Sequence, residues 1–179
     1  GRWHKAAGGT AKFGRAAASL LDGIDRMKEA GYLEQVSMVH FHIGSQIPEI
    51  RRIKGAIKEA ARVYAKLRRR GVPLTVINVG GGLAVDYDGS KTASDASCNY
   101  SVNEYANDVT YTIGEVCQEE KVPMPLMVSE SGRFLTATHS LLVANVLGRI
   151  SADPPPSNGF NEESAPRPVK EMKAMLREL

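Results

Sequence analysis

The chain has 179 residues, of which 42% are hydrophobic and 24% are charged, a composition typical of one soluble globular domain or of part of a larger one. Its net charge of +3 is too small to indicate nucleic-acid binding, and no apolar run reaches the length of about 18 residues that could span a membrane. Cys98 and Cys117 lack the spacing of a disulfide framework or a metal motif, and the first residues do not form a secretory signal, so we expect a cytoplasmic protein with reduced thiols.

The hydrophobic pattern alternates between helical and strand periods along the chain. Glycine and proline mark predicted boundaries at Gly31, Gly71 and Pro73. Ser101 and Glu104 have the spacing of a capping box, which predicts the start of a helix. In chain order, the predicted elements are a helix over 14–30, a strand over 36–42, a helix from residue 50, a strand over 74–79, a helix from residue 101, a strand over 125–129, a fourth strand over 140–147, a loop over 151–168 and a final amphipathic helix over 169–179.

Polar clusters follow the first three predicted strands. These clusters are His42-Ile43-Gly44-Ser45, Gly80-Gly81-Gly82 and Glu130-Ser131-Gly132-Arg133. Strands that alternate with helices predict a parallel α/β sheet. In (β/α)8 barrels the active site is built from loops at the carboxyl ends of the strands, so we expect part of such a barrel. A doubly wound sheet follows a similar rule and is the alternative fold.

The three consecutive glycines predict an anion site, because backbone amides without side chains can converge closely on a ligand. Phosphate is the candidate anion, and Ser45 and Arg133 add a hydroxyl and a guanidinium on the same predicted face. The alternative is a tight turn without a ligand. The glycines are not a Walker loop, since no Gly-Lys-Ser/Thr follows, and they are not a GxGxxG fingerprint.

His42 and Glu130 are the candidate catalytic residues. Strand alternation places His40 and His42 on one face, but no third metal ligand with suitable spacing is present. A core histidine is the other alternative, and the adjacent Gly-Ser loop favours a ring that faces a ligand. Glu130 follows an apolar run, so we expect a partly buried carboxylate that needs a partner. Arg133 could be that partner, or the carboxylate could keep the ring nitrogen of a cofactor protonated.

Taken together, the three clusters resemble, in order and approximate spacing, the motifs of the fold-type III pyridoxal-phosphate decarboxylases, which act on arginine, ornithine, lysine and diaminopimelate. Longer strings are similar to the biosynthetic arginine decarboxylases within that family. These strings are Lys12-Phe-Gly14, His40-Phe-His-Ile-Gly-Ser-Gln46, Asn78-Val-Gly-Gly-Gly-Leu-Ala-Val-Asp-Tyr87, Asn103-Glu-Tyr-Ala-Asn-Asp108 and Glu130-Ser-Gly-Arg133. The match spans about residues 1–150.

The resemblance implies a role for each cluster. His42 would stack on the ring of pyridoxal 5'-phosphate (PLP), and Glu130 would hold the pyridine nitrogen. The phosphate would contact Ser45, Arg133 and the glycine loop of Gly80, Gly81 and Gly82. The implied substrate-binding stretch is Ile77, Asn78, Val79, Gly80, Gly81, Gly82, Leu83, Ala84, Val85, Asp86 and Tyr87. The implied reaction converts L-arginine to agmatine and carbon dioxide in polyamine biosynthesis.

The sequence departs from the family pattern in ways that bear on activity. Ala84 stands where the family usually has glycine, and Thr138-His139 replaces a common His-His pair. The family's Schiff-base lysine would lie upstream of Gly1, and no lysine present, Lys12 included, lies in the matching context. With the absence of an initiator Met, this predicts an internal fragment that is inactive alone. The alternatives are a decarboxylase of another basic amino acid and a noncatalytic regulatory relative.

The resemblance also predicts the domains and partners. Residues 1–138 would form part of the PLP-binding barrel, and residues 139–179 would begin a second, β-rich domain with an inserted loop and a helical segment. We expect a small amino-acid substrate, arginine, and a homo-oligomeric parent protein, with no nucleic-acid or membrane partner. The family suggests Mg²⁺ as a second cofactor, but no cluster of oxygen ligands in the sequence indicates a metal site.

Overall fold

The computed structural model describes Gly14, residues 17–148, Pro166 and residues 168–169. The chain divides into two units, Gly1–Leu141 and Leu142–Leu179. The elements of the first unit are α1 (Ala17–Glu29), the 3-10 helix η2 (Leu33–Gln35), β1 (Met38–His40), α2 (Ile50–Arg69), β2 (Val76–Asn78), α3 (Val102–Glu120), β3 (Leu126–Val128) and the short helix α4 (Gly132–Thr136). The predicted helices up to residue 120 and the first three predicted strands are confirmed, although each strand is shorter than expected.

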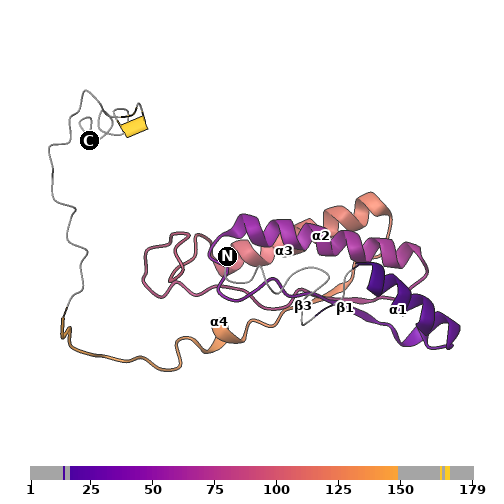
Figure 1. Cartoon of the computed structure of the whole chain (residues 1–179), viewed down its shortest axis with the longest axis horizontal. Coiled ribbons are helices and arrows are strands. Elements are labelled where there is room, and N and C mark those ends of the chain that lie inside the picture. The colour runs from indigo at the N-terminus through magenta and orange to yellow at the C-terminus, as the bar shows by residue number, and fades with distance from the viewer. Residues whose placement is uncertain (1–13, 15–16, 149–165, 167, 170–179) are drawn as a thin grey trace. The chain divides into compact units, whose positions relative to one another are not determined.

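The three strands form a parallel sheet in the order β1-β2-β3. Figure 1 shows β1 and β3 on one side of the helices α2 and α3. One row across the sheet consists of Val39, Ile77 and Met127, and the next consists of His40, Asn78 and Val128. Because side chains alternate along a strand, these two rows face opposite sides of the sheet. The predicted α/β class with a parallel sheet is therefore confirmed.

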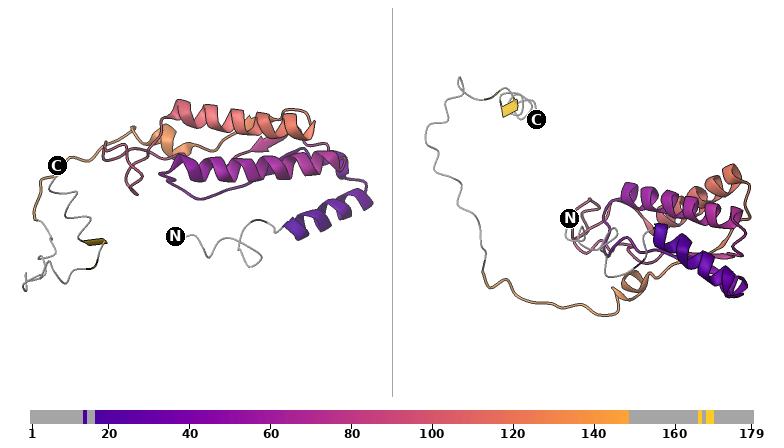
Figure 2. Two further views of the ribbon diagram at one scale, coloured as in Figure 1. Left: turned by 90° about the horizontal axis from the view of Figure 1, so that it is seen from above. Right: turned by 45° about the vertical axis from the view of Figure 1, so that its right-hand side comes forward.

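Helices α2 and α3 lie side by side over the sheet (Figure 2). They bury the row that contains Ile77. Ile53, Tyr64 and Ile113 from these helices are almost fully buried, as is Ile77. The apolar face of α2 recurs at helical spacing, which explains why this helix forms where the sequence predicts it. On the opposite face Leu126 is 67% exposed, because no described element covers that side.

The predicted fourth strand is wrong. Residues 140–147 have no regular secondary structure, and Leu142 among them is 91% exposed. A strand needs a neighbour to complete its backbone hydrogen bonds, and no described strand pairs with this segment. The short helix α4 replaces part of the loop expected after the third strand. The predicted loop over 151–168 and the final helix fall almost wholly outside the described residues, as does Lys12.

Within the described part of the chain, no helix combines the length and the apolar character that crossing a membrane requires.

Candidate functional site

The three polar clusters meet at the carboxyl edge of the sheet, as parallel strand order requires. The Glu130 N–H donates to the Gly80 carbonyl at 2.8 Å, which joins the loop after β3 to the loop after β2. The Ile47 N–H donates to the Gly82 carbonyl at 3.0 Å, which joins the loop after β1 to the same glycines. The glycine loop, Gly80 to Gly82, is therefore the centre of the site.

Close backbone packing explains why three glycines are needed here. A Cβ atom on Gly80 would overlap the carbonyl oxygen of Phe41, and φ at Gly80 is +69°. A Cβ on Gly81 would lie 3.0 Å from the carbonyl oxygen of Glu130. Gly82 has φ +108°, and a Cβ there would lie 3.0 Å from the carbonyl oxygen of Gly44. Any larger residue would push the three loops apart.

The loop leaves two amides for a ligand. The Gly80 N–H donates to Asn78 Oδ1 at 2.8 Å. Among the described residues, no protein acceptor receives the N–H of Gly81 or Gly82. Two adjacent free N–H groups are a common feature of backbone anion sites.

Arg133 and Ser45 are brought together although 88 residues separate them. Arg133 is the second residue of α4, and its Nη2 donates to Ser45 Oγ at 3.1 Å. Its Nη1 donates to the Tyr87 hydroxyl at 3.2 Å. Both Arg133 and Ser45 are exposed, so their polar atoms can bind an anion from solvent.

Glu130 is held by Asn78 and not by Arg133. Asn78 Nδ2 donates to Glu130 Oε1 at 2.8 Å, and His40 Nδ1 lies 3.8 Å from the same oxygen. Arg133 makes no ion pair with Glu130 within the described residues, because the guanidinium turns toward Ser45 and Tyr87. The structure thus excludes the alternative in which Arg133 is the partner of Glu130. The Glu130 side chain is 60% exposed, which is more than the apolar run before it led us to expect, since it follows β3 at the edge of the described sheet.

His42 lies against the glycine loop. Its imidazole Cε1 is 3.6 Å from the position that a Cβ on Gly81 would occupy. The ring is exposed, which rules out the core histidine that the sequence left open. No group of three or more His, Cys, Asp or Glu side chains among the described residues is placed to hold a metal ion.

Two residues that fix the predicted substrate stretch were missed in the sequence. Gln46 holds Val85 from both sides: its Nε2 donates to the Val85 carbonyl at 2.7 Å, and its Oε1 accepts from the Val85 N–H at 3.0 Å. The Tyr100 hydroxyl accepts from the Ala84 N–H at 3.1 Å and donates to the Ile47 carbonyl at 2.8 Å. Burial raises the pKa of Tyr100 to about 12, so it stays protonated and can donate at neutral pH. Gln46 directly follows the motif residue Ser45, and that position was the one available signal.

The alanine at position 84 fits the loop without strain. Ala84 is fully buried and is not among the residues with positive φ. Its backbone therefore needs no glycine, although the family resemblance led us to expect one there.

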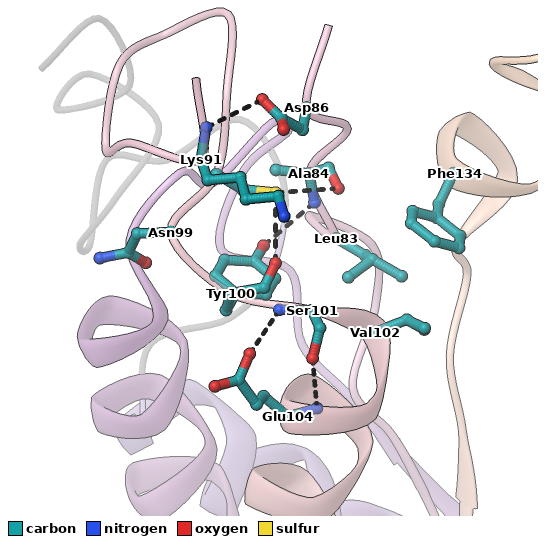
Figure 3. Close-up of a pocket in the computed structure, with 11 residues that line it drawn as sticks. Leu83, Ala84, Asp86, Lys91, Asn99, Tyr100, Ser101, Val102, Glu104 and Phe134 are labelled. Atoms are coloured by element: carbon teal, nitrogen blue, oxygen red, sulfur yellow. Dashed lines mark hydrogen bonds between the residues drawn. The ribbon is translucent and has the colours of Figure 1, made fainter. Parts of the chain in front are cut away.

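A pocket of about 380 Å³ lies beside the predicted substrate stretch (Figure 3). Leu83, Ala84 and Asp86 of that stretch line it, together with Glu104 and Phe134. His42, Glu130 and the glycine loop are not part of this pocket. Its carboxylates are already engaged locally: Asp86 accepts from Ser97 Oγ at 2.5 Å, and Glu104 accepts from the Ser101 N–H at 2.7 Å.

The sequence matches the pyridoxal binding domain of the pyridoxal-dependent decarboxylases over residues 1–137. It is 44% identical to the biosynthetic arginine decarboxylase of Proteus mirabilis, over 94% of this chain and 26% of that protein. It is 45% identical to the biosynthetic arginine decarboxylase of Deinococcus radiodurans, over 100% of this chain and 26% of that protein. The chain thus spans about a quarter of the length of the curated relatives it matches.

Solved structures agree with these matches. The crystal structure of the biosynthetic arginine decarboxylase of Campylobacter jejuni aligns with a TM-score of 0.69 and 37% identity, over 94% of this chain and 28% of that one. The diaminopimelate decarboxylase of Helicobacter pylori, complexed with L-lysine, aligns with a TM-score of 0.53 and 26% identity, over 68% of this chain and 27% of that one.

Proposed function

The chain belongs to the pyridoxal-dependent decarboxylase family through its pyridoxal binding domain, and on that premise we propose that it forms part of a PLP-dependent arginine decarboxylase. The reaction would release carbon dioxide from L-arginine and leave agmatine, a step in polyamine biosynthesis. Identities of 44% and 45% to biosynthetic arginine decarboxylases support arginine over other basic amino acids. The observation that carries the proposal is the meeting of three strand-end loops around the glycine loop.

The residues at this edge fit the phosphate group of PLP. Arg133 Nη2 and Ser45 Oγ lie 3.1 Å apart, so both groups can donate hydrogen bonds to oxygens of the same phosphate group. The free N–H groups of Gly81 and Gly82 add neutral donors. Gly80 shapes the loop, since its own N–H is taken by Asn78.

His42 and Glu130 would hold the ring of the cofactor, each at a different part of it. Bound PLP supplies an electron sink for the electrons that decarboxylation releases. Glu130 would keep the pyridine nitrogen protonated through Oε2, because Oε1 already accepts from Asn78. The His42 imidazole would pack on the ring face and exclude water from it.

The substrate and assembly follow from the same family assignment. The part of the stretch from Ile77 to Tyr87 that faces the site would contact the amino acid, because Ile77 is buried in the core and the Asn78 amide is bonded to Gly80 and Glu130. Gln46 and Tyr100 would fix the backbone of this stretch. Residues 1–138 would belong to a (β/α)8 barrel, and residues 139–179 would begin a second, β-rich domain. The whole protein would be a cytoplasmic homo-oligomer.

A substrate panel tests this function. The protein made from its complete gene, with PLP added, is assayed for carbon dioxide release from arginine, ornithine, lysine and diaminopimelate. We expect arginine to give the highest kcat/KM. A preference for diaminopimelate or lysine would refute the arginine assignment, and no release from any of the four would refute decarboxylation.

The Arg133→Gln variant tests the phosphate contact in the same protein. Loss of a hydrogen bond from a charged group should weaken PLP affinity by about tenfold to a hundredfold. Arg62→Gln is the matched control, because within the described part of the chain Arg62 pairs only with Glu59 on the surface of α2. Equal PLP affinities for the two variants would contradict the role of Arg133.

A further inference from the structure

The side-chain amide of Asn78 is hydrogen-bonded to two other residues of the site, Gly80 and Glu130. Its side chain is 7% exposed at the end of the central strand β2. Both ends of its amide are in use: Oδ1 accepts from the Gly80 N–H at 2.8 Å, and Nδ2 donates to Glu130 Oε1 at 2.8 Å. Both polar atoms of this amide therefore have a protein partner, and one Nδ2 hydrogen and one Oδ1 lone pair remain unused among the described residues.

We infer that Asn78 is the positioning residue that aims the Glu130 carboxylate and ties it to the glycine loop. This inference rests on the proposed function and refines it. One buried amide connects the group that would hold the pyridine nitrogen to the loop that would hold the phosphate. The two ends of the cofactor would therefore be aligned by a single side chain.

Strand geometry explains why position 78 can do this. Asn78 is in register with Val128, and Glu130 follows Val128 by two residues, so all three share one face of the sheet. The Glu130 side chain is 60% exposed, and an exposed carboxylate without a fixed partner would sample several rotamers. The buried amide restricts it to one of them.

An amide suits this position better than a carboxylate. An amide can donate to Glu130 and accept from Gly80 at the same time, whereas an ionised carboxylate only accepts. The other ionisable side chains near Glu130 among the described residues are His40 from β1, 3.8 Å away, and Arg133 on its own loop, which turns toward Ser45 and Tyr87. Neither of these donates a hydrogen bond to Glu130.

Two variants of the complete protein test the inference. Asn78→Ser keeps a short acceptor for the Gly80 N–H, but its hydroxyl is too short to reach Glu130. Asn78→Asp keeps the shape and replaces the donor by an acceptor. Asn103→Ser is the matched control, because Asn103 is exposed in the first turn of α3.

We expect both Asn78 variants to lower kcat by at least about tenfold, with little change in KM for arginine. The ¹⁵N signal of bound ¹⁵N-labelled PLP should move toward that of an unprotonated pyridine nitrogen. A raised KM with unchanged kcat would show a substrate contact and overturn the inference. An unchanged ¹⁵N signal would overturn it as well.

A double-mutant cycle on thermal unfolding separates this inference from the proposed function. Asn78→Asp combined with Glu130→Gln restores a complementary donor and acceptor, so the combined variant should unfold at a higher temperature than Asn78→Asp alone. Purely additive effects would refute the contact even in protein without PLP. If the cycle shows coupling but the wild-type protein binds no PLP, the proposed function fails and the positioning of Glu130 by Asn78 stands.

Discussion

At the scale of single residues, Gly80 packs more closely against a neighbouring backbone than the other two glycines of the loop do. Its positive φ and the nearby Phe41 carbonyl both exclude a side chain. Gly80→Ala should therefore lower the free energy of unfolding by about 2 kcal/mol or more, which urea denaturation would measure.

Gly55 is the matched control, because it lies within α2 and a Cβ there would meet nothing within 4 Å. Gly55→Ala should raise the free energy of unfolding by about 0.5–1 kcal/mol, since alanine is the better helix former. If both alanines had the same effect, the packing argument at Gly80 would fail.

Tyr100 gives a pH-dependent prediction at the same scale. Its pKa of about 12 in the folded protein exceeds the ordinary value of about 10 in an unfolded chain. The folded state thus holds the proton more tightly, so this contribution to stability is full below pH 10 and is lost as the pH rises through 12.

Tyr100→Phe should lower the free energy of unfolding by about 1–3 kcal/mol near neutral pH, because it leaves the Ala84 N–H and the Ile47 carbonyl without their partner. The gap between wild type and variant should shrink as the pH rises from about 10 to about 12. Tyr111→Phe, at an exposed tyrosine of α3, should change stability little. A gap that stays constant across this pH range would contradict the assignment.

Sequence reasoning at this scale found residue types and missed their partners. Arg133, Ser45 and the glycines could be proposed because their chemistry suits phosphate. The contact between Asn78 and Glu130 could not be predicted, because it depends on the register of β2 and β3, which cannot be read from the sequence. Gln46 was missed for the same reason: its partner Val85 is 39 residues away.

At the scale of elements, the best sequence prediction was the start of α3. The Ser101 side chain accepts from the Glu104 N–H at 3.2 Å, and Glu104 accepts from the Ser101 N–H at 2.7 Å. Hydrogen bonds to its carboxylate lower the pKa of Glu104. Both bonds are local, so the residues in the sequence suffice to predict them.

Ser101→Ala should lower the free energy of unfolding by about 1 kcal/mol, because the Glu104 N–H in the first turn of α3 loses its acceptor. Ser19→Ala, at an exposed position within α1, serves as the comparison and should be neutral or slightly stabilising. Chemical denaturation of both variants would measure the difference. A smaller loss for Ser101→Ala than for Ser19→Ala would count against the cap.

The fourth predicted strand shows the limit of local pattern at the element scale. Residues 140–147 have the apolar composition of a buried strand, as do the residues around β1. Only β1 has a described neighbour to pair with. Strand formation depends on that neighbour, so apolar composition alone overestimates it.

At the scale of the whole molecule, the alternation of strands and helices was enough to predict a parallel sheet with its polar loops at one edge. The order of the strands follows the chain, which is the simplest arrangement for such connections. The sequence could not predict that one face of the sheet is exposed, with Leu126 67% exposed on it. Exposure of that face depends on which elements lie against it and not on the strand itself.

The bond between Asn78 and Glu130 has a consequence for how the strands align. Val76, Ile77, Leu126 and Met127 are all apolar, and a pairing shifted by one residue would still bring apolar groups together. Such a shift would turn every side chain of the strand to the other face. It would leave the Asn78 amide and its carboxylate partner on opposite sides, with a polar group buried and unpaired. A single polar contact can thus select one alignment of the central sheet from several that the apolar residues tolerate.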